Sequence, residues 1–317
     1  MQAEDSRLSQ KETTQTIRII TRKSQLAIAQ TYIVIERLQH FYPHLEFRVE
    51  KIETSGDKNL TQPLPLIGGK GVFTEELERA LLEERADLAV HSLKDLPIEL
   101  PAGLTIGACL PREDPSDAVV FRDPSSFRTL QDLPPNSIVG TSSLRRKYTL
   151  QNLYPKLRVK DIRGNLQTRL AKLKNTFPGS QTQYDAIVLA AAGLKRAEIS
   201  DYYQLLPDET FMHAPGQGFL AIECKQDSHI SELLKCFTNP ISEKIHQAER
   251  SLLKSLGGGC HTPLSVYTSV DQDVLTIKAI LYDDNGEVFA AKEASASLES
   301  ADNLGHNLAL SMRTNKP

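Results

Sequence analysis

The sequence predicts an α/β protein with three domains, two α/β domains followed by a small α+β domain. In the first two-thirds of its 317 residues, short apolar runs alternate with runs of helical period. That order predicts largely parallel sheets with helices on their faces. A proline-rich, charged stretch at 110–118 is expected to be a linker that divides this region in two. Near the end, two runs of alternating residues flank Asp284–Gly286, which indicates a β-hairpin.

The first α/β unit is expected to hold four strands and two helices. Ser24 can cap a helix that runs to about His40, because its hydroxyl can accept from an N–H of the first turn. Thr74 can cap a second helix, in which Phe73 and Leu77 belong to one apolar face. The strands are expected at 17–22, 47–54, 87–93 and 104–110.

The later elements follow the same reasoning. Helices are expected from about Leu144 and from about Asn165. A helix over about 242–256 should end before Gly257, a natural C-cap, and a last helix should cover about 299–312. Further strands are expected at 137–143, 157–163, 184–192 and 218–224.

Charge and hydropathy exclude several classes of protein. The net charge of −3 argues against bulk nucleic-acid binding, so any basic site must be local. No run approaches the roughly 20 apolar residues of a membrane span. Residues 1–16 are polar and include acids, so we expect a disordered tail without a targeting signal, on a cytoplasmic protein.

The cysteines indicate no metal site but single out one residue. They show no CxxC spacing, which argues against zinc. Cys109, Cys224 and Cys236 are expected to be small buried apolar residues. Cys260 instead follows three glycines, whose lack of Cβ lets a bulky group come close. From this stretch alone it could be a disulfide partner, a metal ligand, a nucleophile, a covalent anchor, or part of a turn with no function, and adjacency alone does not make His261 its catalytic base.

The stretch "VGTSSLRRK" (139–147) predicts an anion site. An apolar strand leads into Thr141, Ser142 and Ser143, and the helix that follows opens with Arg145 and Arg146. A helix N-terminus offers unpaired N–H groups and the positive end of the dipole. Guanidinium forks suit carboxylates, so donors and charge converge here on an anion.

Two other strand ends repeat this design. "DIRGNLQTRL" carries Arg163, Gly164 and Arg169, and "ITRKSQLA" carries Arg22 before Ser24. In open α/β sheets, ligands bind beyond the carboxyl ends of strands, so these ends can line one cleft for a ligand with several carboxylates or phosphates.

Two further stretches bear on the site. "GGKG" (68–71) lacks the spacing of a phosphate loop, so we interpret it as a mobile loop that carries Lys70. "HSLKDLP" places Lys94 and Asp95 at a strand end, where a carboxylate is a candidate acid, base or cation stabiliser. Taken alone, a surface Lys-Asp turn explains it better.

Together these motifs resemble the porphobilinogen deaminase (hydroxymethylbilane synthase) family. The resemblance runs from about Ile17 into the C-terminal domain. It rests on "TRKSQLA", "GGKGVFTEELE", "DLAVHSLKDLP", "REDPSDA", "GTSSLRR", "RGNLQTRL", "YDAIVLAAAGLKR", "GQG", "AER" and "GGGC", in this order.

The resemblance implies two domains like type II periplasmic binding proteins and a small third domain. The implied boundaries are 17–113 with 217–238, then 114–216, then 239–317. It further implies that a monomer condenses four porphobilinogens, with loss of ammonia, on a dipyrromethane cofactor. Hydrolysis then releases 1-hydroxymethylbilane, which passes to uroporphyrinogen-III synthase.

The family motifs also imply residue roles. Cys260 would hold the cofactor through a thioether, and Asp95 would be the catalytic carboxylate that stabilises the cation left when ammonia departs. The implied cofactor contacts are Lys94, Thr141, Ser142, Ser143, Arg145, Arg146, Arg163, Gly164 and Gln217. The implied substrate contacts are Arg22, Ser24, Lys70, Arg169 and Arg196.

Some positions depart from the family pattern. Leu66 and Gln25 replace a common lysine and a common proline, "FMHAPGQG" is an unusual lead into the glutamine, and the C-terminus is short.

Two other classes of protein remain. A non-catalytic binding protein would need the cleft but not Cys260. A cysteine hydrolase would need a histidine paired with the thiol in space.

Overall fold

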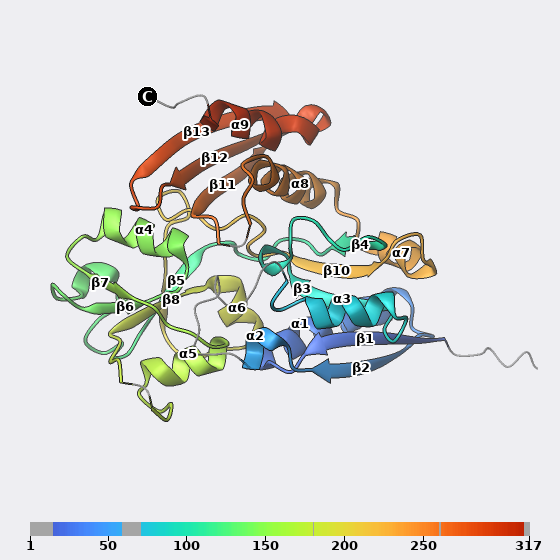
Figure 1. Cartoon of the computed structure of the whole chain (residues 1–317), viewed down its shortest axis with the longest axis horizontal. Helices are drawn as coiled ribbons and strands as arrows, with labels where there is room; N and C mark the ends of the chain where they lie inside the picture. The colour runs from blue at the N-terminus through green and yellow to red at the C-terminus, as the bar shows by residue number, and fades with distance from the viewer. Residues whose placement is uncertain (1–14, 59–70, 180, 260, 314–317) are drawn as a thin grey trace, which may run out of the picture.

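The computed structural model describes residues 15–58, 71–179, 181–259 and 261–313, and it contains three β-sheets. Figure 1 shows them as three lobes, with the third sheet and its helices lying above the other two. Lys70, Leu66 and Cys260 lie outside the described residues. No helix in the described part of the chain is long and apolar enough to cross a bilayer.

The first sheet has the strand order β2-β1-β3-β10-β4. β1 is parallel to β2 and β3, whereas β10 runs antiparallel to β3 and β4. Its strands are β1 (Thr16–Arg22), β2 (Glu46–Ile52), β3 (Leu88–Ser92), β4 (Leu104–Cys109) and β10 (Leu220–Lys225). The helical segments are α1 (Gln25–Phe41), α2 (Ser55–Lys58), α3 (Glu75–Leu82), α7 (His229–Leu233) and the 3₁₀ turns η2 (Leu93–Asp95) and η4 (Leu234–Phe237).

The second sheet repeats this pairing pattern in the order β7-β6-β8-β5-β9. β6 is parallel to β7 and β8, and β5 runs antiparallel to β8 and β9. Its strands are β5 (Asp117–Phe121), β6 (Ile138–Gly140), β7 (Arg158–Lys160), β8 (Ala186–Ala190) and β9 (Tyr203–Leu205). The helices are α4 (Leu144–Leu153), α5 (Leu166–Leu173), α6 (Ala191–Arg196) and the 3₁₀ turn η3 (Leu130–Asp132).

Two segments connect these sheets. The chain leaves β4 through 110–116 to enter β5, and it returns from β9 through 206–219 to enter β10. The antiparallel strand of each sheet is therefore the strand that arrives from the other lobe.

The third lobe packs two helices against a three-stranded antiparallel sheet, with buried Leu252, Val266, Ile277 and Leu308 in one core. The expected hairpin is confirmed as β12 and β13, and Asp283 Oδ1 accepts from the N–H groups of Asn285 and Glu287 in its turn. The elements are α8 (Pro240–Ser255), β11 (Leu264–Asp271), β12 (Val274–Tyr282), β13 (Val288–Ser297), the 3₁₀ turn η5 (Leu298–Asn303) and α9 (Leu304–Arg313).

The alternation of strand residues explains the core of the first sheet. In β1, Ile17 and Ile19 pack into one buried cluster, and Ile20 packs into a second. Successive side chains of a strand point to opposite faces, so a strand covered on both faces is apolar on both. In "IRII", Ile17 and Ile19 supply one face and Ile20 supplies the other, while Arg18 lies at the exposed end of that second face.

Several sequence predictions need correction. The stretch 110–118 is not all linker, because Asp117 and Ala118 begin the buried strand β5. The strand expected at 184–192 ends at Ala190, and α6 begins at the next residue. Thr74 occupies the N-cap position of α3 but makes no side-chain capping bond. Cys236 is only partly buried, while Cys109 and Cys224 are buried as expected.

A buried ion pair fastens the third lobe to both connecting segments. Arg112 donates to Glu249 of α8 at 2.8 Å, and it also donates to the backbone oxygen of Gln217 at 2.8 Å. Glu249 Oε2 accepts from the N–H of Gly216 at 2.7 Å. Because the Glu249 side chain is 0% exposed, its charge depends on these partners.

Replacing Glu249 by glutamine should therefore destabilise the fold. Breaking a buried pair leaves an uncompensated charge and costs about 3–5 kcal/mol. Burial alone would raise the pKa of Glu249, but Arg112 and neighbouring donors hold it below its ordinary value. The ion pair is thus complete at neutral pH and is lost as the pH falls through the acid range. Calorimetry should show a lower Tm for Glu249→Gln than for the parent. The difference in Tm should become smaller as the pH falls.

Glu243→Gln, on the same helix but only partly buried, serves as the control and should melt close to the parent. Equal melting of parent and Glu249→Gln at neutral pH would show that the junction adds no stability.

Candidate active site

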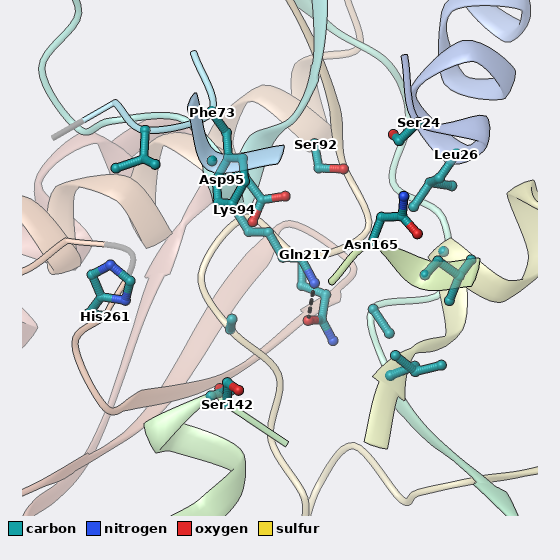
Figure 2. Close-up of a pocket in the computed structure, with 18 of the residues that line it drawn as sticks. Ser24, Leu26, Phe73, Ser92, Lys94, Asp95, Ser142, Asn165, Gln217 and His261 are labelled. Carbon is teal, nitrogen blue, oxygen red and sulfur yellow. Dashed lines mark hydrogen bonds between the residues drawn. The ribbon is translucent and has the colours of Figure 1, made fainter. Parts of the chain in front are cut away.

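A cleft of about 990 Å³ is lined by residues from all three lobes. Figure 2 shows Ser24, Lys94, Asp95, Ser142, Asn165, Gln217 and His261 around it. The predicted site residues that line it are Arg22, Ser24, Lys94, Asp95, Ser142, Ser143, Arg145, Arg146, Arg163, Gly164, Arg169, Arg196 and Gln217. Thr141 is buried and is not among the lining residues. Lys70 and Cys260 lie outside the described residues.

The cleft is basic although the protein is not. Among the described residues, nine lysines and arginines line it, against four aspartates and glutamates. Among the described residues no group of three His, Cys, Asp or Glu side chains could hold a metal ion. Positive charge in a recess of low dielectric focuses attraction on an anionic ligand.

The three predicted helix N-termini are formed and capped. Ser24 accepts from the N–H of Ala27, Ser143 from that of Arg146, and Asn165 from that of Thr168. Each cap has extended backbone and places the first turn of its helix at the cleft. The local sequence thus fixes where α1, α4 and α5 begin.

The hydroxyls before α4 are used to build the loop. Ser142 donates to the carbonyl of Ile162 and accepts from the N–H of the same residue. Thr141 accepts from the N–H of Ser143 at 3.2 Å. The two bonds between Ser142 and Ile162 join the segments that follow β6 and β7, and Arg145 and Arg163 both line the cleft.

Arg145 and Arg146 share one buried carboxylate that the sequence analysis missed. Arg145 donates to Asp117 Oδ2 at 2.8 Å, and Arg146 donates to Oδ1 at 2.7 Å. Asp117 is 0% exposed. Burial alone would raise its pKa, but the two guanidinium charges outweigh it and hold the pKa well below its ordinary value. In the sequence, Asp117 stood out only as part of the motif "REDPSDA". No local pattern predicts that its partners lie in α4.

Gln217 links this group to the other lobe. Its amide nitrogen donates to Asp117 Oδ1 at 2.8 Å and to the carbonyl of Pro115 at 2.6 Å. Its oxygen accepts from the ammonium of Lys94 at 3.1 Å, the bond drawn dashed in Figure 2. Gln217 is 1% exposed, and both polar atoms of its side chain bond to other protein groups.

The surroundings of Lys94 disfavour its charged form. Burial, followed by the repulsion of Arg146, lowers its pKa to about 8. Asp95 follows it in η2 and is exposed in the cleft. Figure 2 shows the Asp95 carboxylate near Phe73 and above Gln217. The strand end thus offers an ammonium and a carboxylate side by side, as the sequence predicted.

Arg22 has a partner that the sequence analysis also missed. Asp57 of α2 pairs with it through both oxygens, and Arg22 lies 4.4 Å above the centre of the Phe73 ring. An incoming carboxylate must share this guanidinium with Asp57.

Three arginines of the second lobe complete the basic wall. Arg169 donates to the carbonyl of Gly164, and Arg196 donates to that of Gly218. Burial lowers the pKa of each to about 10, and it also lowers the pKa of Arg163. All three remain charged at neutral pH.

The third lobe contributes the segment around residue 260. Gly257, Gly258, Gly259, His261 and Thr262 line the cleft. A Cβ at Gly258 would meet the Thr262 hydroxyl oxygen at 2.5 Å, so only glycine fits there without a shift. The described neighbours of residue 260 on both sides thus face the cleft.

Comparison with known proteins identifies the family. A family model described as "Porphobilinogen deaminase, dipyromethane cofactor binding domain" matches residues 17–232, and one described as "Porphobilinogen deaminase, C-terminal domain" matches 245–314. The chain belongs to the porphobilinogen deaminase family. It is 43% identical to the porphobilinogen deaminase of Nostoc sp. over 94% of this chain and 91% of that one. The Gloeobacter violaceus porphobilinogen deaminase is 45% identical over 93% and 89%.

Two solved structures are similar to about three quarters of the chain. The Bordetella pertussis BvgS periplasmic VFT2 domain covers 75% of this chain and 92% of its own at 14% identity, with a TM-score of 0.38. A probable amino-acid ABC transporter extracellular-binding protein from Bacillus subtilis covers 75% and 97% at 12% identity, with a TM-score of 0.42.

The lowered pKa of Lys94 predicts a pH-dependent affinity. The ammonium is present below a pH of about 8 and is lost as the pH rises through that value. If Lys94 attracts a carboxylate, KM for porphobilinogen should rise between a pH of about 7 and one of about 9, because the attraction disappears with the charge. Steady-state kinetics across this range measure it.

Lys94→Met should show a high KM at every pH and no step near 8. The exposed Lys235→Met variant should follow the parent. A flat KM profile in the parent would contradict a role for the Lys94 charge.

Proposed function

We propose that this protein is the transferase that condenses four porphobilinogens, with loss of ammonia, on a dipyrromethane primer attached to Cys260. Hydrolysis then gives 1-hydroxymethylbilane. The observation that carries the proposal is the basic cleft, where strand ends of both α/β lobes and the glycine loop of the third lobe meet around Asp95. A pyrrole with an acetate and a propionate is an anion, and each unit joined adds two more carboxylates.

The residues of the cleft fit such a primer. Its volume of about 990 Å³ lies at the upper end of the usual range for small-molecule sites. The buried Nε atoms of Arg145 and Arg146 have no hydrogen-bond partner in the described structure, although both residues are 5% exposed or less. Buried donors are normally paired, so two unpaired guanidinium donors beside a cleft suit a carboxylate ligand. When bound, the primer supplies the pyrrole carbon to which the next unit is joined.

The protein's own groups then have separate tasks. The arginines of α4 and α5 bind carboxylates and hold the pyrroles in position. This lowers the entropic part of the activation free energy. Asp95 holds a negative charge where positive charge develops on the substrate as ammonia leaves. Arg22, Ser24, Arg163, Arg169 and Arg196 are proposed contacts along the path of the chain, and Lys70 is proposed as a further one.

The finer expectations remain part of this proposal. We propose a thioether at Cys260, a monomer in the cytoplasm, and transfer of the product to uroporphyrinogen-III synthase. The motif resemblance supports each of them.

The attachment of the primer is tested by mass. Protein purified from cells that make porphobilinogen should be heavier than its sequence mass by one dipyrromethane, and Cys260→Ser should remove the increment, because serine lacks the thiolate that forms the bond. Intact-protein mass spectrometry measures both. Cys236→Ser, which alters a partly buried thiol in η4, should keep the increment. An unmodified parent with full activity would end the proposal.

The role of Asp95 is tested by single-turnover ammonia release from primer-loaded protein. Asp95→Asn keeps the shape but loses the charge, so it should lose about 2.7–4 kcal/mol of transition-state stabilisation, or about a hundredfold to a thousandfold in rate. Asp95→Glu keeps the charge but moves it by one methylene, so its rate should lie between those of the parent and of Asp95→Asn. Glu99→Gln, which alters another carboxylate of the lining, is the control and should stay near the parent. Parental ammonia release by Asp95→Asn would exclude Asp95 as the catalytic carboxylate.

A further inference from the structure

Asp117 has no task in the proposed reaction. It is the first residue of β5, it is 0% exposed, and it is not among the residues that line the cleft. It therefore stays out of contact with a ligand in the cleft. Burying a carboxylate is expensive unless it is fully paired, so its presence here needs an explanation.

Each guanidinium beside Asp117 is held at two points. Arg145 donates to Asp117 with one terminal nitrogen and to the carbonyl of Met212 at 2.6 Å with the other. Arg146 donates to Asp117 and, at 3.1 Å, to the carbonyl of Val188. A planar fork bound at both ends cannot rotate, so the orientation of each remaining Nε–H is fixed.

The charges make the carboxylate necessary for this arrangement. The two arginines follow each other at the start of α4, and both are almost completely buried. Two buried cations in one place repel each other strongly. One carboxylate between them, with one oxygen for each, offsets half of that charge and leaves a net positive site for an anion.

We propose that Asp117 is a positioning residue, which holds Arg145 and Arg146 in the geometry that binds the substrate's carboxylates. This inference rests on the proposed function. Gln217 extends the group, because its amide ties Asp117 Oδ1 to the Lys94 ammonium of the other lobe. The cations of both lobes are thereby set relative to one carboxylate.

Stability alone is a weaker explanation. A buried ionic group is often no more stable than apolar residues of the same volume. Both arginines line the cleft. Apolar residues in their place could not bind an anion there. The two explanations differ in their consequence: a structural ion pair affects the Tm, whereas a positioning residue also affects the substrate affinity of folded protein.

The test compares Asp117→Asn with Asp185→Asn in primer-bearing protein. Asp185 lies just before β8 in the same sheet, pairs with Arg122 at 2.7 Å, and does not line the cleft. Both variants lose one ion-paired carboxylate. Only Asp117→Asn should raise KM for porphobilinogen, by about tenfold or more, which is the effect of losing one charge-assisted contact. Its primer-loaded fraction, read by intact mass, should also fall, whereas Asp185→Asn should keep the parent values.

A lowered Tm for Asp117→Asn with parental KM and primer loading would overturn the proposal. Asp117→Glu keeps the charge and should recover part of the affinity, since both guanidiniums again find a carboxylate. If Asp117→Asn and Asp117→Glu both fail to fold, the parent protein still decides the matter.

In the parent, ¹⁵N–¹H spectra of arginine-labelled protein should show slowly exchanging Nε–H signals for Arg145 and Arg146. The signals are assigned by the loss of one in Arg145→Lys and of the other in Arg146→Lys. Fast exchange at both would mean that the guanidiniums are not fixed, which contradicts the proposal. A parent that does not consume porphobilinogen would instead refute the proposed function, and the spectra would remain a separate test of the positioning.

Discussion

One buried carboxylate between two buried guanidiniums determines how the cleft of this protein is built. Asp117, Arg145 and Arg146 are each 5% exposed or less, and each would be costly to bury alone. The carboxylate comes from the strand that enters the second lobe from the first, and the arginines come from the helix opposite it. The anion site therefore exists only when β5 is in place in its sheet.

The same constraint joins the three lobes. Gln217, on the returning segment, bonds to Asp117 and to Lys94, while its backbone oxygen accepts from Arg112. Arg112 in turn pairs with Glu249 of the third lobe, which leads through α8 to the glycine loop before residue 260. The binding groups of the first two lobes and the loop of the third are thus fixed through one chain of buried polar contacts. A growing chain of carboxylates needs such a wall, because every added unit brings new charges.

The sequence predicted what is local and missed what depends on distant partners. Ser24, Ser143 and Asn165 could be identified as caps because the bond lies within one helical turn. Lys94 and Asp95 could be placed at a strand end from the apolar run before them. The linker predicted over 110–118 overlaps the start of the strand at Asp117, because a charged and proline-rich approach masks this short buried strand. Its pairing with α4, and that of Asp57 with Arg22, bring together residues far apart in the chain, and no periodicity indicates either.

A crystal structure of protein purified from porphobilinogen-producing cells tests the central claim most directly. The account predicts density continuous with residue 260 that extends into the cleft. Carboxylates of that density should lie within hydrogen-bond distance of the Arg145 and Arg146 guanidiniums, while both still bind Asp117 and Gln217 still joins Asp117 to Lys94. Density that leaves the cleft, or carboxylates bound elsewhere with these two arginines bonded only to the protein, would contradict it.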